Sequence, residues 1–203
     1  MTFIVALFSA TFGKFAIRES RIMRKHSGMR PQDVPILLKI ATHWGNRSGG
    51  FLKRPMLQKK IALELRVSPS EVTESLARSA FAGLYDPTTK RVMPNALFDF
   101  LQYGLKYVFP QQPGALVRGI PTAHSAKPLS DLIRSAEHYV WPSADGTIRG
   151  QAIEPLYPTI VQAVDNDPRL YEMLALVDAI RVGKAREVSL AVDELGKRLL
   201  LSK

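Results

Sequence analysis

The stretch from residue 61 to residue 85 limits the possible folds of this chain more than any other. Ile61 and Leu65 are four residues apart, which places both on one face of a helix. Residues 68–71 then read Ser-Pro-Ser-Glu: an N-cap serine, a proline at the first helical position and a glutamate three residues after the serine. Residues 82–84, Ala-Gly-Leu, end the second helix. The stretch therefore predicts two helices joined by a tight turn.

This pattern resembles the helix-turn-helix of winged-helix transcription regulators, most closely the MarR-like bacterial type, over roughly residues 31–95. The resemblance implies sequence-specific binding of double-stranded DNA. One departure is Arg66, which stands at the turn position that the family usually gives to glycine. The corner must tolerate a side chain there, and a positive φ, uncommon for residues other than glycine, is one solution. The alternative is a helical hairpin in an α-rich domain of another kind.

The flanking segments predict the rest of a winged helix-turn-helix over residues 31–109. An earlier helix begins at residues 31–33 and continues with an apolar stripe at helical spacing. The turn residues Asp-Pro-Thr-Thr at 86–89 stand beside Lys90 and Arg91. They predict a wing of two short strands with a basic tip. A further helix follows, and its predicted apolar face consists of Leu97, Phe98, Leu101, Leu105 and Val108.

The second half of the chain is predicted to be rich in helix. Residues 110–128 are rich in proline and glycine and predict a connecting segment, with an extended run that lies on the chain's own surface. Residues 129–140 indicate a helix, and the Asp-Gly at 145–146 indicates the turn of a β-hairpin. The Asp-Pro at 167–168 begins an amphipathic helix that Gly183 ends, and a last helix follows. These two helices predict a C-terminal helical hairpin.

The predicted fold is thus mainly α with a small β wing, a winged helix-turn-helix followed by an α-rich region. The first part of the chain is expected to be a flexible basic extension. Its apolar start is shorter than the about 20 residues that span a bilayer, and no basic residue precedes it as in a signal peptide. We therefore expect a cytoplasmic protein without membrane contact, with a membrane anchor as the alternative. The expected divisions are an extension at 1–30, a DNA-binding domain at 31–109, a connecting segment at 110–128 and a partner or dimerisation region at 129–203.

The distribution of charge supports a nucleic-acid partner. Of a net charge of +10, the first 30 residues carry six Lys and Arg against one Glu. Residues 31–110 carry eleven against six, whereas residues 111–203 carry eleven of each sign. A basic first half and a neutral second half are typical of a nucleic-acid reader joined to a protein-contacting module.

The sequence gives no indication of catalysis or of a bound cofactor. There are no cysteines, and the four histidines are scattered without the spacing of a metal site. No nucleophile elbow, phosphate-binding glycine loop or dinucleotide fingerprint occurs. We therefore expect a protein that is not an enzyme and that needs no cofactor or metal.

Candidate DNA contacts lie in the predicted helix-turn-helix and its wing. Ser70, Thr73 and Glu74 are expected to approach bases, since a glutamate can accept from cytosine N4 in the major groove. Arg78 is expected to hold the DNA backbone. For each single lysine, a solvated helix face is the alternative. The full candidate set is Lys53, Arg54, Lys59, Ser68, Ser70, Glu71, Thr73, Glu74, Arg78, Lys90 and Arg91.

The C-terminal hairpin is expected to need a covering surface, because each of its helices is predicted to carry a single apolar stripe. Packing on the body of the chain with a contribution to a homodimer is one solution, and a wholly intramolecular hairpin is the other. The predicted dimer or partner residues are Leu174, Val177, Val188, Val192 and Leu195.

Two functions fit these patterns. The first is a sequence-specific, dimeric bacterial transcription regulator whose second half responds to a partner or a ligand. The second is a winged-helix protein-interaction module, such as an antitoxin-like or accessory partner of a neighbouring gene product. The charge asymmetry favours the first, and the large neutral second half is compatible with the second.

Overall fold

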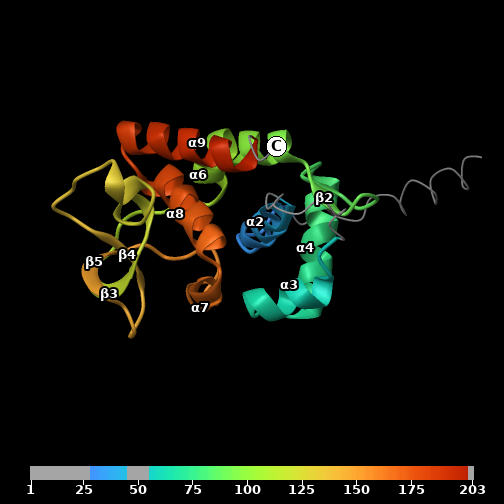
Figure 1. The fold of residues 1–203 in the computed structure, drawn as a ribbon, viewed down its shortest axis with the longest axis horizontal. Coiled ribbons are helices and arrows are strands. Elements are labelled where there is room, and N and C mark those ends of the chain that lie inside the picture. The colour runs from blue at the N-terminus through green and yellow to red at the C-terminus, as the bar shows by residue number, and fades with distance from the viewer. Residues whose placement is uncertain (1–27, 45–54, 201–203) are drawn as a thin grey trace, which may run out of the picture.

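The computed structural model describes residues 28–44 and 55–200, so the candidate contacts Lys53 and Arg54 lie outside the described residues. The fold is mainly helical with little β-structure (Figure 1). The first half contains the helices α2 (Asp33–Trp44), α3 (Gln58–Leu65) and α4 (Pro69–Phe81), and then the short strands β1 (Tyr85–Asp86) and β2 (Arg91–Val92).

Helix α2 is the centre of this first half. Its residues from Asp33 to Ile40 are all buried, and the helix contacts α3 and α4 on one side and α8 (Pro168–Val182) on the other. Figure 1 shows α2 between α8 and the pair formed by α3 and α4. The helix thus joins the two halves of the molecule into one core.

The turn between α3 and α4 confirms the local predictions. Arg66 has φ 54° and ψ 42°, the left-handed conformation expected where a glycine is usual. Ser68 caps α4 by accepting a hydrogen bond from the backbone N–H of Glu71 at 3.1 Å, and a proline follows the cap. The second half of the predicted capping box is different, because the Glu71 carboxylate accepts from Gln32 and Arg78 instead.

The predicted turn after α4 is also confirmed. Tyr85 pairs with Val92 and Asp86 with Arg91 in an antiparallel hairpin. The Asp86 carboxylate accepts from the backbone N–H of Thr88 and the hydroxyl of Thr89, which fixes the turn.

The next helical segment contains a π-helical turn. It runs through α5 (Pro94–Asp99), the π-helix η1 (Phe100–Gly104) and α6 (Leu105–Val108). Leu97, Leu101 and Leu105 are fully buried as the spacing predicts, whereas Val108 is 50% exposed. Because a π-turn inserts an extra residue, it rotates the positions after it and moves Val108 off the predicted apolar face.

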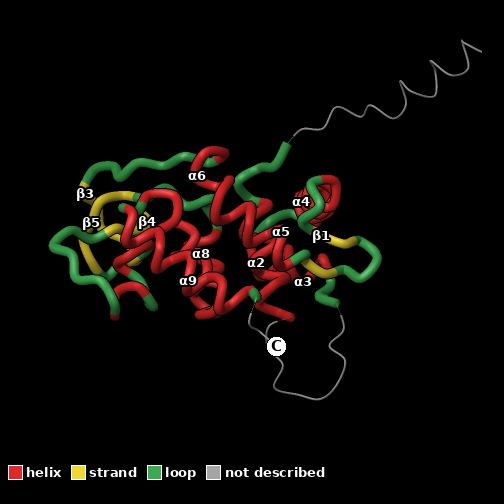
Figure 2. Tube along the Cα trace, turned by 90° about the horizontal axis from the view of Figure 1, so that it is seen from above, coloured by secondary structure: helices red, strands yellow, loops and turns green. Residues whose placement is uncertain are grey.

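The connecting segment contributes a strand to a small sheet. Strand β3 (Leu116–Pro121) is antiparallel to both β4 (Tyr139–Pro142) and β5 (Ile148–Ala152). This confirms an extended run that packs on the chain itself. Figure 2 shows the sheet at the end of the molecule opposite the β1–β2 hairpin.

Two predictions for this region are wrong. Residues 129–140 form no long helix: a 3-10 turn, η3 (Leu129–Asp131), is followed by strand β4, whose aromatic and β-branched residues are buried in the sheet. The Asp-Gly at 145–146 does not close a hairpin, because β4 and β5 run parallel over their paired residues. A Cβ atom added to Gly146 would lie 2.3 Å from the Cα of Gly119, so this glycine allows close packing of the loop on β3.

The C-terminal helical hairpin is confirmed. After α7 (Ile160–Ala163) and the 3-10 turn η4 (Val164–Asn166), α8 begins with an Asp167 side-chain cap and ends at Gly183, and α9 (Ala185–Leu199) follows. The single apolar stripe expected for α8 is wrong, since eight consecutive residues from Met173 to Ile180 are buried. Helix α8 packs on α2, α6 and α9, so every side of its middle is covered. Within the described residues, no helix has the length and apolar character that a membrane crossing needs.

Candidate nucleic-acid interface

Helix α4 has one face in the core and one exposed stripe. Val72, Ser75, Leu76 and Ser79 are buried against the rest of the first half. The exposed stripe consists of Ser70, Thr73, Glu74, Ala77 and Phe81. These positions follow the helical repeat, so their side chains project from one side of α4. We refer to these five residues as the α4 stripe.

Arg78 is not available to a DNA backbone, and the prediction of that role is wrong. Its side chain is 7% exposed, and its Nε and Nη2 atoms donate to the two carboxylate oxygens of Asp33 at 3.0 and 2.7 Å. Nη2 also donates to Glu71 at 2.6 Å. Asp33 lies 45 residues earlier, at the start of α2. This bidentate ion pair therefore joins α4 to α2 and has a structural role.

Glu71 belongs to the same cluster and is likewise not free to contact a base. Burial alone would raise the pKa of Glu71, but hydrogen bonds from Arg78 and Gln32 lower it below its ordinary value. The hydrogen bonds that Arg78 donates to Asp33 raise the pKa of Arg78. Both groups therefore stay ionised and paired, which corrects the candidate role of Glu71 as a DNA contact.

The remaining described candidates lie on the surface. Lys59 is exposed at the start of α3, Lys90 and Arg91 are exposed beside the hairpin turn, and Ser70, Thr73 and Glu74 are exposed on α4. The Arg91 guanidinium stands over the Trp44 ring, 4.2 Å from its centroid. This cation–π contact orients the Arg91 side chain against the end of α2. Ser68 is exposed, but its hydroxyl caps α4.

One polar contact on this surface was not found from the sequence. Gln58, the first residue of α3, lies with its side-chain amide oxygen 3.1 Å from the Thr73 hydroxyl oxygen. The Thr73 hydroxyl is also 3.0 Å from the carbonyl oxygen of Pro69. Gln58 and Thr73 are 15 residues apart and meet only because α3 and α4 cross, which no local pattern reveals.

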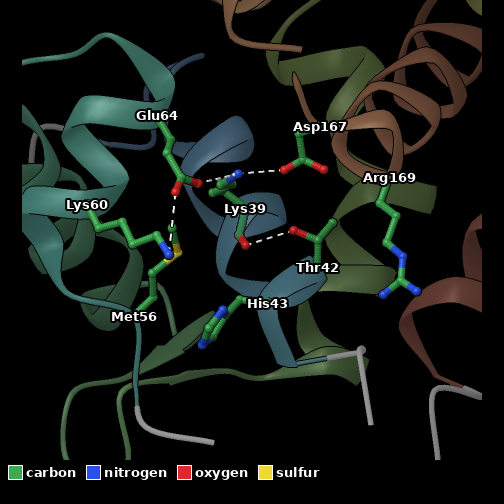
Figure 3. Close-up of a pocket in the computed structure, with 8 residues that line it drawn as sticks. All are labelled: Lys39, Thr42, His43, Met56, Lys60, Glu64, Asp167 and Arg169. Atoms are coloured by element: carbon green, nitrogen blue, oxygen red, sulfur yellow. Dashed lines mark hydrogen bonds and ion pairs between the residues drawn. The ribbon is translucent and has the colours of Figure 1, made fainter. Parts of the chain in front are cut away.

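A polar cavity of about 200 Å³ lies beside α3, between the first half and α8 (Figure 3). Near it the Lys39 ammonium contacts Glu64 at 2.6 Å and Asp167 at 2.5 Å, and so joins α2, α3 and the start of α8. Burial would lower the pKa of Lys39, but the hydrogen bonds to Asp167 and Glu64 raise it above its ordinary value. The cavity is lined by Lys39, Thr42, His43, Met56, Lys60, Glu64, Asp167 and Arg169.

Helix α3 has two further contacts with the C-terminal part. The Thr159 hydroxyl donates to the carbonyl of Leu65 at 2.8 Å, and the Arg66 guanidinium donates to Gln162 at 2.9 Å. Together with the Lys39 contacts, these bonds fix the position of α3 from the side of α7 and α8.

The prediction that Leu174, Val177 and Leu195 contact a dimer partner is wrong. Leu174 and Val177 are 2% and 0% exposed, and Leu195 is 0% exposed, all within the chain's own core. Val188 and Val192 are only partly buried on α9, so their part in a partner contact stays a prediction. The apolar sides of the hairpin are therefore covered by the chain itself, with α9 against α5 and α8 against α2 and α6.

Buried polar groups also attach the small sheet to α8. The Asp178 carboxylate accepts from the Trp141 indole N–H at 2.6 Å, the Thr122 hydroxyl at 2.8 Å and the Arg181 guanidinium at 2.7 Å. Burial raises the pKa of Asp178, although Arg181 and the other donors act in the opposite direction. The Asp178 carboxylate is buried and hydrogen-bonded by these three donors, so we assign the cluster a structural role.

The structure contains no arrangement typical of a metal centre in the ranges 28–44 and 55–200, where no three His, Asp or Glu side chains come together. No protein-family model, curated protein or solved structure matches the chain.

Proposed function

We propose that this chain is a winged helix-turn-helix protein that binds double-stranded DNA as a transcription regulator, with α4 as the helix that enters the major groove. The observation that supports the proposal best is the α4 stripe with basic residues at both ends. Lys59 and Lys60 are exposed on α3, and Lys90 and Arg91 are exposed beside the hairpin turn. Figure 1 shows α3 near one end of α4 and the hairpin near the other.

This layout matches what duplex DNA requires. A major groove about 12 Å wide admits one helix, and the phosphates on its two sides are best met by cations on the flanking elements. Ser70 and Thr73 of the α4 stripe supply short polar side chains for the groove, and the flanking lysines and Arg91 supply the charge. In this reading, α7, α8 and α9 hold α3 in place, and the second half is where a partner or ligand would act.

A second candidate function is suggested by the charge of α4 itself. Its only basic residue is Arg78, which is buried, whereas the α4 stripe contains the acidic Glu74 and a Phe81 that is 74% exposed. An exposed aromatic side chain is typical of a protein-contacting surface, and an acidic one is unfavourable beside phosphates. This favours a winged-helix interaction module, such as an antitoxin-like or accessory partner, as the alternative.

Salt dependence of duplex binding separates the two functions. Fluorescence anisotropy of a mixed-sequence duplex, titrated with the full chain at several salt concentrations, measures the observed binding constant. For DNA binding we expect log K to fall linearly with log salt, with a slope of about −0.9 for each neutralised phosphate. Absence of binding, or binding that salt leaves unchanged, would contradict the DNA-binding proposal and favour the interaction module.

A further inference from the structure

We propose that Gln58 reads an adenine base in the major groove and that Thr73 is its positioning residue. The inference depends on the DNA binding proposed above and adds the base that the surface recognises. Base recognition would then involve a residue of α3 held by a residue of α4, and not α4 alone.

The contact between Gln58 and Thr73 determines how the amide is held. The Thr73 hydroxyl lies 3.1 Å from the end of the Gln58 amide and 3.0 Å from the carbonyl of Pro69, one turn earlier in α4. Its single hydrogen cannot serve both acceptors fully. When the Gln58 amide is flipped by half a rotation, its oxygen and nitrogen exchange places. An amide N–H then donates to the Thr73 hydroxyl oxygen, and the Thr73 hydroxyl donates to the carbonyl of Pro69. Both bonds are then satisfied, and the two ends of an amide have the same shape.

This arrangement gives Gln58 a defined recognition pattern. One amide N–H and the amide oxygen stay open to solvent, because both Gln58 and Thr73 are exposed. A donor beside an acceptor matches adenine, which presents its N7 acceptor and its N6 amino donor in the major groove. Guanine presents two acceptors there, and one of them would face the Gln58 oxygen.

The other polar groups of the surface are less suited to read a base. The Ser70 hydroxyl is 2.9 Å from that of Ser68, and the Glu74 carboxylate is 3.7 Å from Arg78. The Glu74 carboxylate is also negatively charged, so the DNA phosphates repel it. Among the described side chains of the α4 stripe and its neighbour Gln58, the amide is the one neutral group that carries its donor and its acceptor on two separate atoms, as a bidentate contact with adenine needs.

The experiment begins with selection of duplexes from a randomised library by the full chain. We expect an adenine preference at one position that is lost in Gln58→Ala while other positions keep theirs. Affinity of Gln58→Ala for the selected site should fall by roughly 5- to 150-fold, the range for one bidentate base contact. Thr73→Val, which keeps the shape and removes the hydroxyl, should weaken the same preference, and Thr73→Ser should retain it. Lys59→Ala, one residue along α3, should instead weaken all sequences alike.

A modified base gives the decisive comparison. Replacing the selected adenine by 7-deazaadenine removes N7, so it should weaken wild-type binding and leave the binding of Gln58→Ala unchanged. Equal effects of the modified base on both proteins would overturn the inference, as would a Gln58→Ala variant that weakens all sequences equally. In either case salt-dependent binding would persist, so the proposed function would stand. Loss of all salt-dependent binding by the wild type would overturn both.

Discussion

Helices α4 and α8 have 13 and 15 residues, and they are used in opposite ways. Helix α4 has a buried face and an exposed stripe, whereas α8 is buried on all sides over most of its length. The difference shows which helix can present side chains to another molecule and which one holds the fold together. Substitutions on α8 should therefore reduce stability, and substitutions on the α4 stripe should change binding.

The two helices also differ in the contacts of their buried charged residues. On α4 a buried arginine pairs with Asp33 and anchors the presenting helix to α2. On α8 the buried Asp178 accepts three hydrogen bonds from the sheet and from its own helix. Each helix thus has a buried charged residue that binds it to its neighbours, but of the two only α4 keeps an exposed stripe.

The largest effect is expected for Arg78→Ala. This substitution leaves the buried Asp33 carboxylate without its cationic partner, and breaking a buried pair in this way costs about 3–5 kcal/mol of unfolding free energy. Urea unfolding measures the loss. Adding Asp33→Asn should recover part of it, because the unpaired charge is then removed. A single variant as stable as the wild type would show that the pair is not an anchor.

Leu174→Ala should be nearly as damaging, since it opens a cavity in the middle of α8. A buried leucine replaced by alanine typically costs about 2–5 kcal/mol. The matched control on the exposed helix is Glu74→Ala, which should stay within about 0.5 kcal/mol of the wild type. Similar losses for the two variants in thermal or urea unfolding would remove the distinction between α4 and α8.

A smaller effect, on binding alone, is expected from the hairpin. Lys90→Ala with Arg91→Ala should reduce the salt slope of duplex binding by up to about 1.8, since each phosphate contact contributes about 0.9. The fold should remain, because both residues are exposed. Arg134→Ala with Arg149→Ala removes the same charge from exposed positions in the second half and should leave the slope unchanged. Equal salt slopes for the two double variants would show that the hairpin does not contact the DNA.

The smallest effect concerns pH. The folded-state pKa of Glu71 is below its ordinary value of 4.5, so its ionised form stabilises the protein above that pH. This contribution is lost as pH falls through the folded-state pKa. The difference in unfolding free energy between wild type and Glu71→Gln should therefore shrink from about pH 6 to about pH 3. Glu74→Gln serves as the exposed control, and a difference that grows in acid would contradict the pairing.

The local features of the first half could be predicted because their causes lie within a few residues. The Ser68 cap and the left-handed Arg66 depend on neighbours in sequence, and the structure contains both. The role of Arg78 could not be predicted this way. Its partner lies 45 residues upstream, and helical spacing alone placed it beside the exposed residues.

The second half was harder to predict for the same physical reason. Residues 139–142 are apolar and β-prone, a short run that fits a helix end as well as a strand. Strand β3, more than 15 residues upstream, makes it a strand by pairing with it. The Asp-Gly turn signal was misleading because β4 and β5 pair in parallel, so the loop between them is not a hairpin turn.

Photo-crosslinking tests most directly whether α4 is the helix that presents its side chains to DNA. A benzophenone side chain at Ala77, in the middle of the α4 stripe, is compared with one at Ala185, which is exposed at the start of α9. We predict covalent attachment to duplex DNA from position 77 that is lost at high salt, and little from position 185. Crosslinking to DNA from position 185 but not from position 77, or from neither, would contradict the assignment.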